Sequence, residues 1–136
     1  MNKIEKIENL HQLPNLKYLH LSNNRISEIS GLENLPNLRN LALNANKINT
    51  IKGLENLPNL ELLFLNDNQI SHLGNIEVLK NLYKIHLDYN PISEAELDKL
   101  EGKRNRKTVY HKDYLRRVIP ELRSIKKKDD FSSKKN

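Results

Sequence analysis

The octapeptide GLENLPNL occupies residues 31–38 and recurs without a change at residues 53–60, which is 22 residues later. When the chain is aligned on the last leucine of this octapeptide, units with the pattern LxxLxLxxNxIxxIxxLxxLxx begin at residues 16, 38, 60 and 82. Residues 2–15 match the second half of the same unit. Self-similarity at a fixed period of this length is typical of a solenoid, in which each unit forms one coil and buries its apolar edge against the next.

The positions inside the unit predict what each coil looks like. Leucine or isoleucine alternates with other residues at the period of a β-strand, so we expect one short strand per unit, with the apolar side chains inside. An asparagine follows each strand at the bend, where a buried amide can hydrogen-bond the backbone of the bend and of the neighbouring coil. We interpret these positions as scaffold: Leu19/Leu21, Leu41/Leu43, Leu63/Leu65, Ile85/Leu87, and the asparagines Asn24, Asn46, Asn68 and Asn90.

One further position is shared by Gly31, Gly53 and Asn75, with Asn9 before them. Glycine and asparagine are the residues that best tolerate a positive φ angle. The sequence therefore predicts a left-handed turn at this position of every coil.

These repeats resemble the 22-residue intracellular class of leucine-rich repeats, as found in regulatory subunits of protein phosphatase one. The resemblance covers residues 2–92. It implies an α/β fold: a short right-handed solenoid of four to five repeats, with a parallel sheet on the concave side and short helical turns outside. It also implies a scaffold or regulatory subunit, with phosphatase-type catalytic subunits or ribonucleoprotein proteins as the partner classes.

The repeat pattern breaks after residue 92, and the chain divides there into three predicted parts: repeats over 1–92, a helical cap with a degenerate last repeat over 93–125, and a disordered basic tail over 126–136. Ser93 and Glu96 have the spacing of a capping box that opens a helix, and Gly102 is a stop signal. The stretch NP-I … Y-x-x-x-V-I-P-x-L, at residues 90–92 and 114–122, resembles the C-terminal cap of the spliceosomal A-prime protein. In that cap Tyr114, Leu115 and Val118 would seal the last coil.

The N-terminal end has no comparable cap. Ile4, Ile7, Leu10 and Leu13 would lie near an open end of the solenoid, where a polar outer surface is normally needed. Three interpretations stay open: a short coil suffices, this end pairs with another surface, or the chain is a piece of a longer array.

The residues between and just after the inward-facing leucines form the concave face, and this face holds the candidate binding site. Leu62 and Phe64 alternate with core leucines and should face outward, where exposed aromatic and aliphatic side chains mark contact sites. The flanking Tyr83 would add an amphipathic anchor. The alternative is that Leu62 and Phe64 pack on each other or on the stems of Lys84 and Arg39. The candidate partner-binding residues are Tyr18, His20, Leu62, Phe64, Lys84, His86, Asp88 and Tyr89.

The sequence offers little for catalysis or metal binding. There is no cysteine, no glycine-rich phosphate loop, no HExxH and no calcium-binding loop. His20 and His86 share one column of the concave face but lie three strands apart, about 14 Å, which is too far to share a metal. His86 and Asp88 share a face and could hydrogen-bond, but no serine nucleophile accompanies them. We expect neither an enzyme nor a cofactor.

The net charge of +6 is concentrated at one end of the chain. Residues 1–100 hold 10 Lys/Arg and 12 Asp/Glu, whereas residues 101–136 hold 13 and 5. Basic segments of this kind bind RNA phosphates, so the alternative function is an RNA- or ribonucleoprotein-associated protein using residues 103–128.

The polar first residues and the absence of a long apolar run favour an intracellular protein, cytoplasmic or nuclear. We expect a protein partner on the concave face, with nucleic acid as the alternative, and neither a membrane nor a small-molecule substrate.

Overall fold

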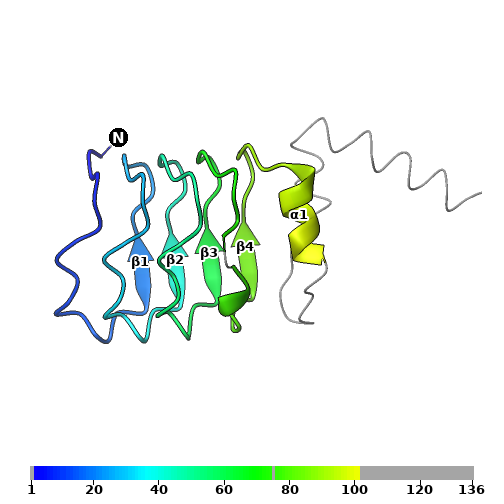
Figure 1. The fold of residues 1–136 in the computed structure, drawn as a ribbon. Helices are drawn as coiled ribbons and strands as arrows, with labels where there is room; N and C mark the ends of the chain where they lie inside the picture. Colours follow the sequence, from blue (N-terminus) through cyan, green and yellow to red (C-terminus); the bar gives the residue numbers. More distant parts are fainter. Residues whose placement is uncertain (1, 75, 102–136) are drawn as a thin grey trace, which may run out of the picture.

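The computed structural model describes residues 2–74 and 76–101. A row of coils runs from the N-terminus to a helix at its far end, and the strands line one side of the row (Figure 1). The elements are the strands β1 (Tyr18–His20), β2 (Asn40–Ala42), β3 (Leu62–Phe64) and β4 (Lys84–His86), the short 3₁₀ helix η1 (Ile76–Val78) between β3 and β4, and the helix α1 (Glu94–Glu101). The four strands form one parallel sheet in the order β1-β2-β3-β4. This arrangement confirms the predicted repeat solenoid and its parallel sheet.

The sheet register follows the repeat. Leu19 pairs with Leu41, Leu41 with Leu63, and Leu63 with Ile85, so each residue lies beside the residue 22 positions further on. A slip by one residue would turn every inward leucine to the outside, which is why an aliphatic core specifies this register. The inward side chains form one continuous aliphatic core that extends from Ile7 to Leu97.

The asparagine after each strand ties its coil to the preceding one, as predicted. The side-chain amide of Asn46 donates to the Leu43 carbonyl of its own coil and to the Leu21 carbonyl of the coil before, both at 3.0 Å. Its Oδ1 accepts the backbone N–H of Ile26, also at 3.0 Å. Asn68 and Asn90 repeat the same three contacts one and two coils further along. A buried polar group that is satisfied in this way stabilises the stack.

The left-handed turns confirm the prediction at Asn9, Gly31 and Gly53, which have φ angles of 64°, 72° and 75°. In the third coil the left-handed residue is Gly74, with a φ of 59°, one position before the predicted one. The predicted position itself, Asn75, lies outside the described residues.

Close approach between coils explains why glycine takes the turn in the third coil. A Cβ atom on Gly53 would lie 2.2 Å from the Ile29 carbonyl oxygen, and one on Gly74 would lie 2.0 Å from the carbonyl oxygen of Ile51. Asn9 belongs to the partial unit of residues 2–15, which has no described coil before it, so an asparagine fits there. The turn needs a positive φ in every coil, but it needs glycine only where a neighbouring carbonyl lies against it.

The helix α1 begins after Ser93, whose hydroxyl accepts the backbone N–H of Glu96 at 3.3 Å, as the capping pattern predicts. The Glu96 carboxylate also reaches back to the third coil, where it accepts the backbone N–H of Leu73 at 2.9 Å. Leu97 is buried in the core. The rest of the predicted cap, including Gly102, Tyr114, Leu115 and Val118, and the predicted tail lie outside the described residues.

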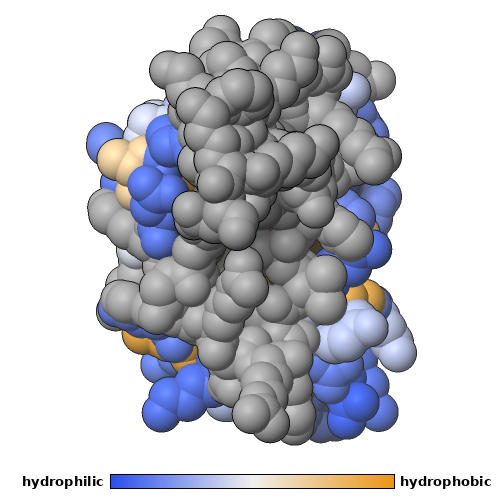
Figure 2. Space-filling view, turned by 90° about the vertical axis from the view of Figure 1, so that its right-hand side faces the viewer, coloured by the Kyte–Doolittle hydropathy of each residue, from blue (hydrophilic) through white to orange (hydrophobic). Residues whose placement is uncertain are grey.

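The outer side of the coils is built from turns rather than the short helical turns that we expected; in the described part of the chain η1 is the one exception. Seen along the solenoid from the α1 end, the visible rim around the uncertain residues is mostly hydrophilic, with a few small apolar areas (Figure 2). Within residues 2–74 and 76–101, no helix has the length and apolar character needed to cross a membrane.

Candidate partner-binding face

Two rows of side chains cross the concave face in register. The first row is Tyr18, Asn40, Leu62 and Lys84, and the second row is His20, Ala42, Phe64 and His86. Both rows come from positions that flank the inward-facing middle residue of each strand, and they therefore lie on the side of the sheet away from the core. The sheet thus brings six of the eight predicted contact residues onto one surface. The other two, Asp88 and Tyr89, follow β4.

The exposure of the predicted contact residues differs along the face. Tyr18 and Tyr89 are 66% and 62% exposed, which is high for aromatic side chains. Leu62 and Phe64 are only half-buried and not fully open, which differs from the expectation that nothing would cover them.

Phe64 is covered on one side by His86. The two rings are stacked, with centroids 4.8 Å apart and an angle of 14° between their planes. The sequence-based alternative suggested that Leu62 and Phe64 pack on each other or on Lys84 and Arg39. The Arg39 guanidinium lies 3.8 Å from the Glu61 carboxylate, where β2 and β3 begin. Because β3 and β4 are adjacent and in register, the histidine at the equivalent position is the natural stacking partner for Phe64.

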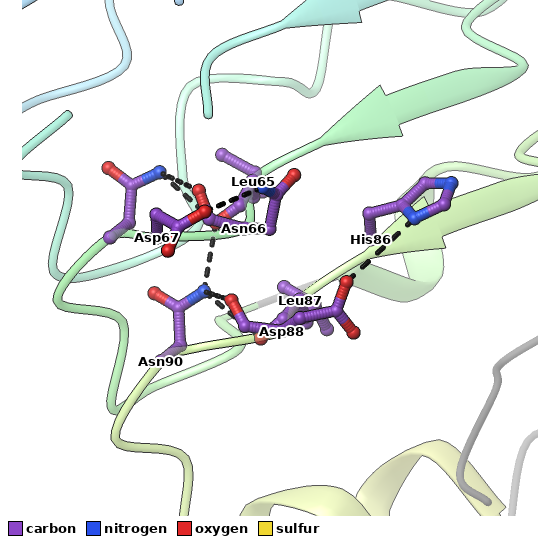
Figure 3. A network of polar contacts seen from close by, with 8 residues as sticks. Leu65, Asn66, Asp67, His86, Leu87, Asp88 and Asn90 are labelled. Atoms are coloured by element: carbon purple, nitrogen blue, oxygen red, sulfur yellow. Dashed lines mark hydrogen bonds and ion pairs between the residues drawn. The ribbon is translucent and has the colours of Figure 1, made fainter. Parts of the chain in front are cut away.

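Asp88 lies close to the His86 ring of this stack. Its Oδ2 lies 4.0 Å from Nδ1 of His86 (Figure 3), an ion-pair distance that is longer than a hydrogen bond. Asp88 is buried, 7% exposed, where the sequence predicted a contact residue. Its backbone carbonyl accepts the N–H of Asp67 at 2.9 Å, which joins the two turns that follow β3 and β4. The position of Asp88 suits orienting His86 better than touching a partner.

The residues just after the strands form a second left-handed position that the sequence reasoning missed. Asn23, Ala45, Asp67 and Tyr89 have φ angles of 60°, 56°, 57° and 57°. A bulky residue rarely adopts this backbone conformation, so Tyr89 is an outlier. The signal available in the sequence was the asparagine and the aspartate in this column, since these residues adopt positive φ more readily than others. The turn places the Tyr89 ring at the end of the concave face, where it is exposed.

The register leaves His20 three strands from His86, as predicted. No group of three or more His, Cys, Asp or Glu side chains that could hold a metal ion is found in the part of the chain that the structure describes. What the face offers is a mixture of aromatic, aliphatic and amide groups on a rigid sheet, which suits binding another molecule's surface.

Comparisons with known proteins bear on the repeats. A family model described as leucine-rich repeats (two copies) matches residues 1–34 and 14–56. A comparison with curated protein sequences gives no significant match.

Several solved structures have a similar fold. An internalin (inlF) of Listeria monocytogenes is 29% identical with a TM-score of 0.68, over 74% of this chain and 30% of that one. An internalin C2 (inlC2) from the same species is 37% identical with a TM-score of 0.60, over 68% of this chain and 41% of that one. A leucine-rich-repeat protein of Leptospira interrogans is 32% identical with a TM-score of 0.57, over 74% of this chain and 33% of that one.

The chain therefore spans less than half the length of each of these proteins. The closer resemblance to phosphatase-one regulatory subunits and to the A-prime cap stays a prediction. What the family model, the structural neighbours and the parallel sheet establish together is that this chain is built of leucine-rich repeats, folded as a short solenoid.

Proposed function

We propose that the chain is a protein–protein interaction module, a scaffold or regulatory subunit, which binds its partner through the concave face. Solenoid repeats generally create extended surfaces for binding other proteins. The single observation that carries the proposal is the cluster on this face: the Phe64–His86 stack, half-buried Leu62 beside it, and the exposed rings of Tyr18 and Tyr89 at its ends.

The chemistry of this cluster is that of an interface. Aromatic side chains supply large contact areas and are enriched among the residues that dominate binding energy. Phe64 is held in place by its stack on His86, so it loses little freedom when a partner covers it. Tyr18 and Tyr89 combine an apolar ring with a polar hydroxyl group. They lie at opposite ends of the sheet, on β1 and after β4.

The second candidate is an RNA- or ribonucleoprotein-associated protein that uses residues 103–128. The observation that favours it is the charge of residues 101–136, with 13 Lys/Arg against 5 Asp/Glu. This segment lies outside the described residues, so only its composition supports the idea. The intracellular location and the phosphatase-like or ribonucleoprotein-like partner classes are likewise proposals that rest on the sequence.

The test separates folding from binding. The partner is first captured with the unaltered chain from cells of the native source, and its affinity is then measured for the variants Phe64→Ala and Tyr89→Ala. Removal of an aromatic anchor from the centre of an interface costs about 2 kcal/mol or more, which is a loss of at least about 30-fold in affinity. We expect this loss with nearly unchanged melting. Val78→Ala, in η1 outside the concave face, is the matched apolar truncation and should bind normally.

Two outcomes would contradict the proposal. If Phe64→Ala and Tyr89→Ala bind normally, the concave face is not the site. If charge reversal at Arg104, Arg106 and Lys107 abolishes binding, and the affinity falls steeply with salt, the RNA-associated alternative replaces it. An apolar contact on the sheet should depend only weakly on salt.

A further inference from the structure

We infer that the concave face accepts an aromatic side chain of its protein partner over Ala42, between His20 and Phe64. This inference rests on the proposed function and names the chemical class of the anchor that the partner would contribute. It would make Ala42 the residue that determines specificity.

The argument begins with the row that crosses the middle of the sheet. His20, Ala42, Phe64 and His86 are aligned by the pairing of β1 with β2, β2 with β3, and β3 with β4. Phe64 and His86 are stacked with their centroids 4.8 Å apart. This distance is also the separation of neighbouring strands, about 4.8 Å. On β3 and β4, therefore, the row holds one ring for each strand, stacked at the strand spacing.

Ala42 interrupts this stack. It carries a methyl group where the other three members of the row carry rings, and it is half-buried. His20 and Phe64 lie two strand spacings apart, about 9.6 Å. A flat ring placed midway would lie about 4.8 Å from each neighbour, within the range of about 4.5–7 Å that aromatic pairs prefer. One face of the Phe64 ring is covered by His86, and the other face is on the Ala42 side.

The charges around Ala42 favour an uncharged ring over a lysine or arginine side chain. Its neighbours on the same face of β2 and of the following turn are two amides, Asn40 and Asn44, both half-buried. Asn44 is held in place because its Oδ1 accepts the Ser22 hydroxyl. In the same columns of the sheet as Asn40 and Asn44, the charged residues are Lys84 and Asp88, which belong to the coil of β4, two coils away. Amide groups beside an apolar stack suit an aromatic ring with a polar tip, such as tyrosine.

The test uses a defined probe and the full chain in isotope-labelled form. N-acetyl-L-tyrosinamide is titrated into the protein and followed by NMR. We expect saturable shifts at His20, Ala42 and Phe64, with the Ala42 methyl signal moved upfield by the ring above it. N-acetyl-L-leucinamide and N-acetyl-L-argininamide are the comparison probes and should bind more weakly, because neither supplies an uncharged ring.

Variants locate the probe. Ala42→Leu fills the position with the chain's own side chain and should weaken binding about tenfold, the worth of two lost aromatic contacts. Ala95→Leu, on the exposed side of α1, is the matched control and should leave binding unchanged. Phe64→Leu removes one ring from the stack at a similar volume and should weaken binding without blocking the position. It serves as the second variant should Ala42→Leu lower the melting temperature.

The inference is wrong if the tyrosine probe causes no saturable shift at Ala42, or if the leucine or arginine probe binds there equally well. It is also wrong if the shifts gather around Leu62 and Lys84 and ignore the Ala42→Leu change. None of these results decides the proposed function, because the loss of affinity in Phe64→Ala and Tyr89→Ala is measured separately, with the partner itself, and Tyr89 lies after β4, away from Ala42.

Discussion

The coil of residues 16–37 and the coils after it, called the inner coils, have nearly the same sequence pattern but different surroundings. In the inner coils, the amide of Asn46 donates to its own coil and to the coil before it, whereas the amide of Asn24 donates only within its own coil in the described part of the chain. Leu41 is fully buried, but its counterpart Leu19 is only partly buried. The difference indicates that the preceding coil adds contacts that a coil cannot make alone.

The largest contrast is expected at the left-handed turns. Gly53→Ala places a Cβ atom against the Ile29 carbonyl and also strains a φ angle of 75°. This change should lower the free energy of unfolding by about 3 kcal/mol or more, whereas Asn9→Ala should cost only about 1 kcal/mol, from the φ angle alone. Chemical denaturation of both variants measures the difference. Equal losses would show that contact with the preceding coil is not what demands glycine.

A smaller contrast is expected between the asparagines. Asn68→Ala removes two contacts to the preceding coil, with Leu43 and Ile48, and one to Leu65 of its own coil, so its loss should be about 2–3 kcal/mol. Asn24→Ala breaks no donor bond to a preceding strand, so it should cost about 1 kcal/mol less than the inner variant. Thermal melts of the two variants provide the comparison. The same midpoint for both would mean that the cross-coil bond of the inner asparagines contributes nothing.

The smallest effect is expected on the outer surface, where contacts between coils are exposed. The Lys52 ammonium lies 2.7 Å from the Glu28 carboxylate of the preceding coil. Its hydrogen bond and its charge hold the pKa of Glu28 below the ordinary value. A lowered pKa contributes stability above the ordinary pKa of the carboxyl, and this contribution is lost as the pH falls through the folded-state pKa.

Lys52→Gln should therefore raise the pKa of Glu28 toward its ordinary value, which an NMR titration of the Glu28 carboxyl carbon would detect. Because both side chains are exposed, the melting midpoint at neutral pH should hardly change. A large drop in the midpoint would show that surface contacts between coils matter as much as the buried asparagines.

The fold was predictable because the repeat states the same physical requirement several times. Leucines at the strand period, an asparagine at each bend and glycine in the turn all agree, so a single interpretation satisfies every coil.

The same periodicity places Asn37, Asn59 and Asn81 after a proline or lysine, and the sequence reasoning overlooked them. Their amides donate to the carbonyls of Pro14, Pro36 and Pro58, at 3.0, 2.8 and 2.6 Å, and form a second, exposed ladder between coils.

By itself, the sequence determined the solenoid, the register of its sheet, the scaffold asparagines and which side chains leave the core. These features follow from local period and from the burial of apolar side chains. Only the tertiary structure decided the contacts between adjacent coils. These are the stack of Phe64 on His86, the burial of Asp88 beside His86, the bond from the Leu73 N–H to Glu96, and the left-handed turn at Gly74. Sequence position specifies the face on which a side chain lies, but its neighbour across the sheet is 22 residues away, and the distance between the two is set when the coils stack.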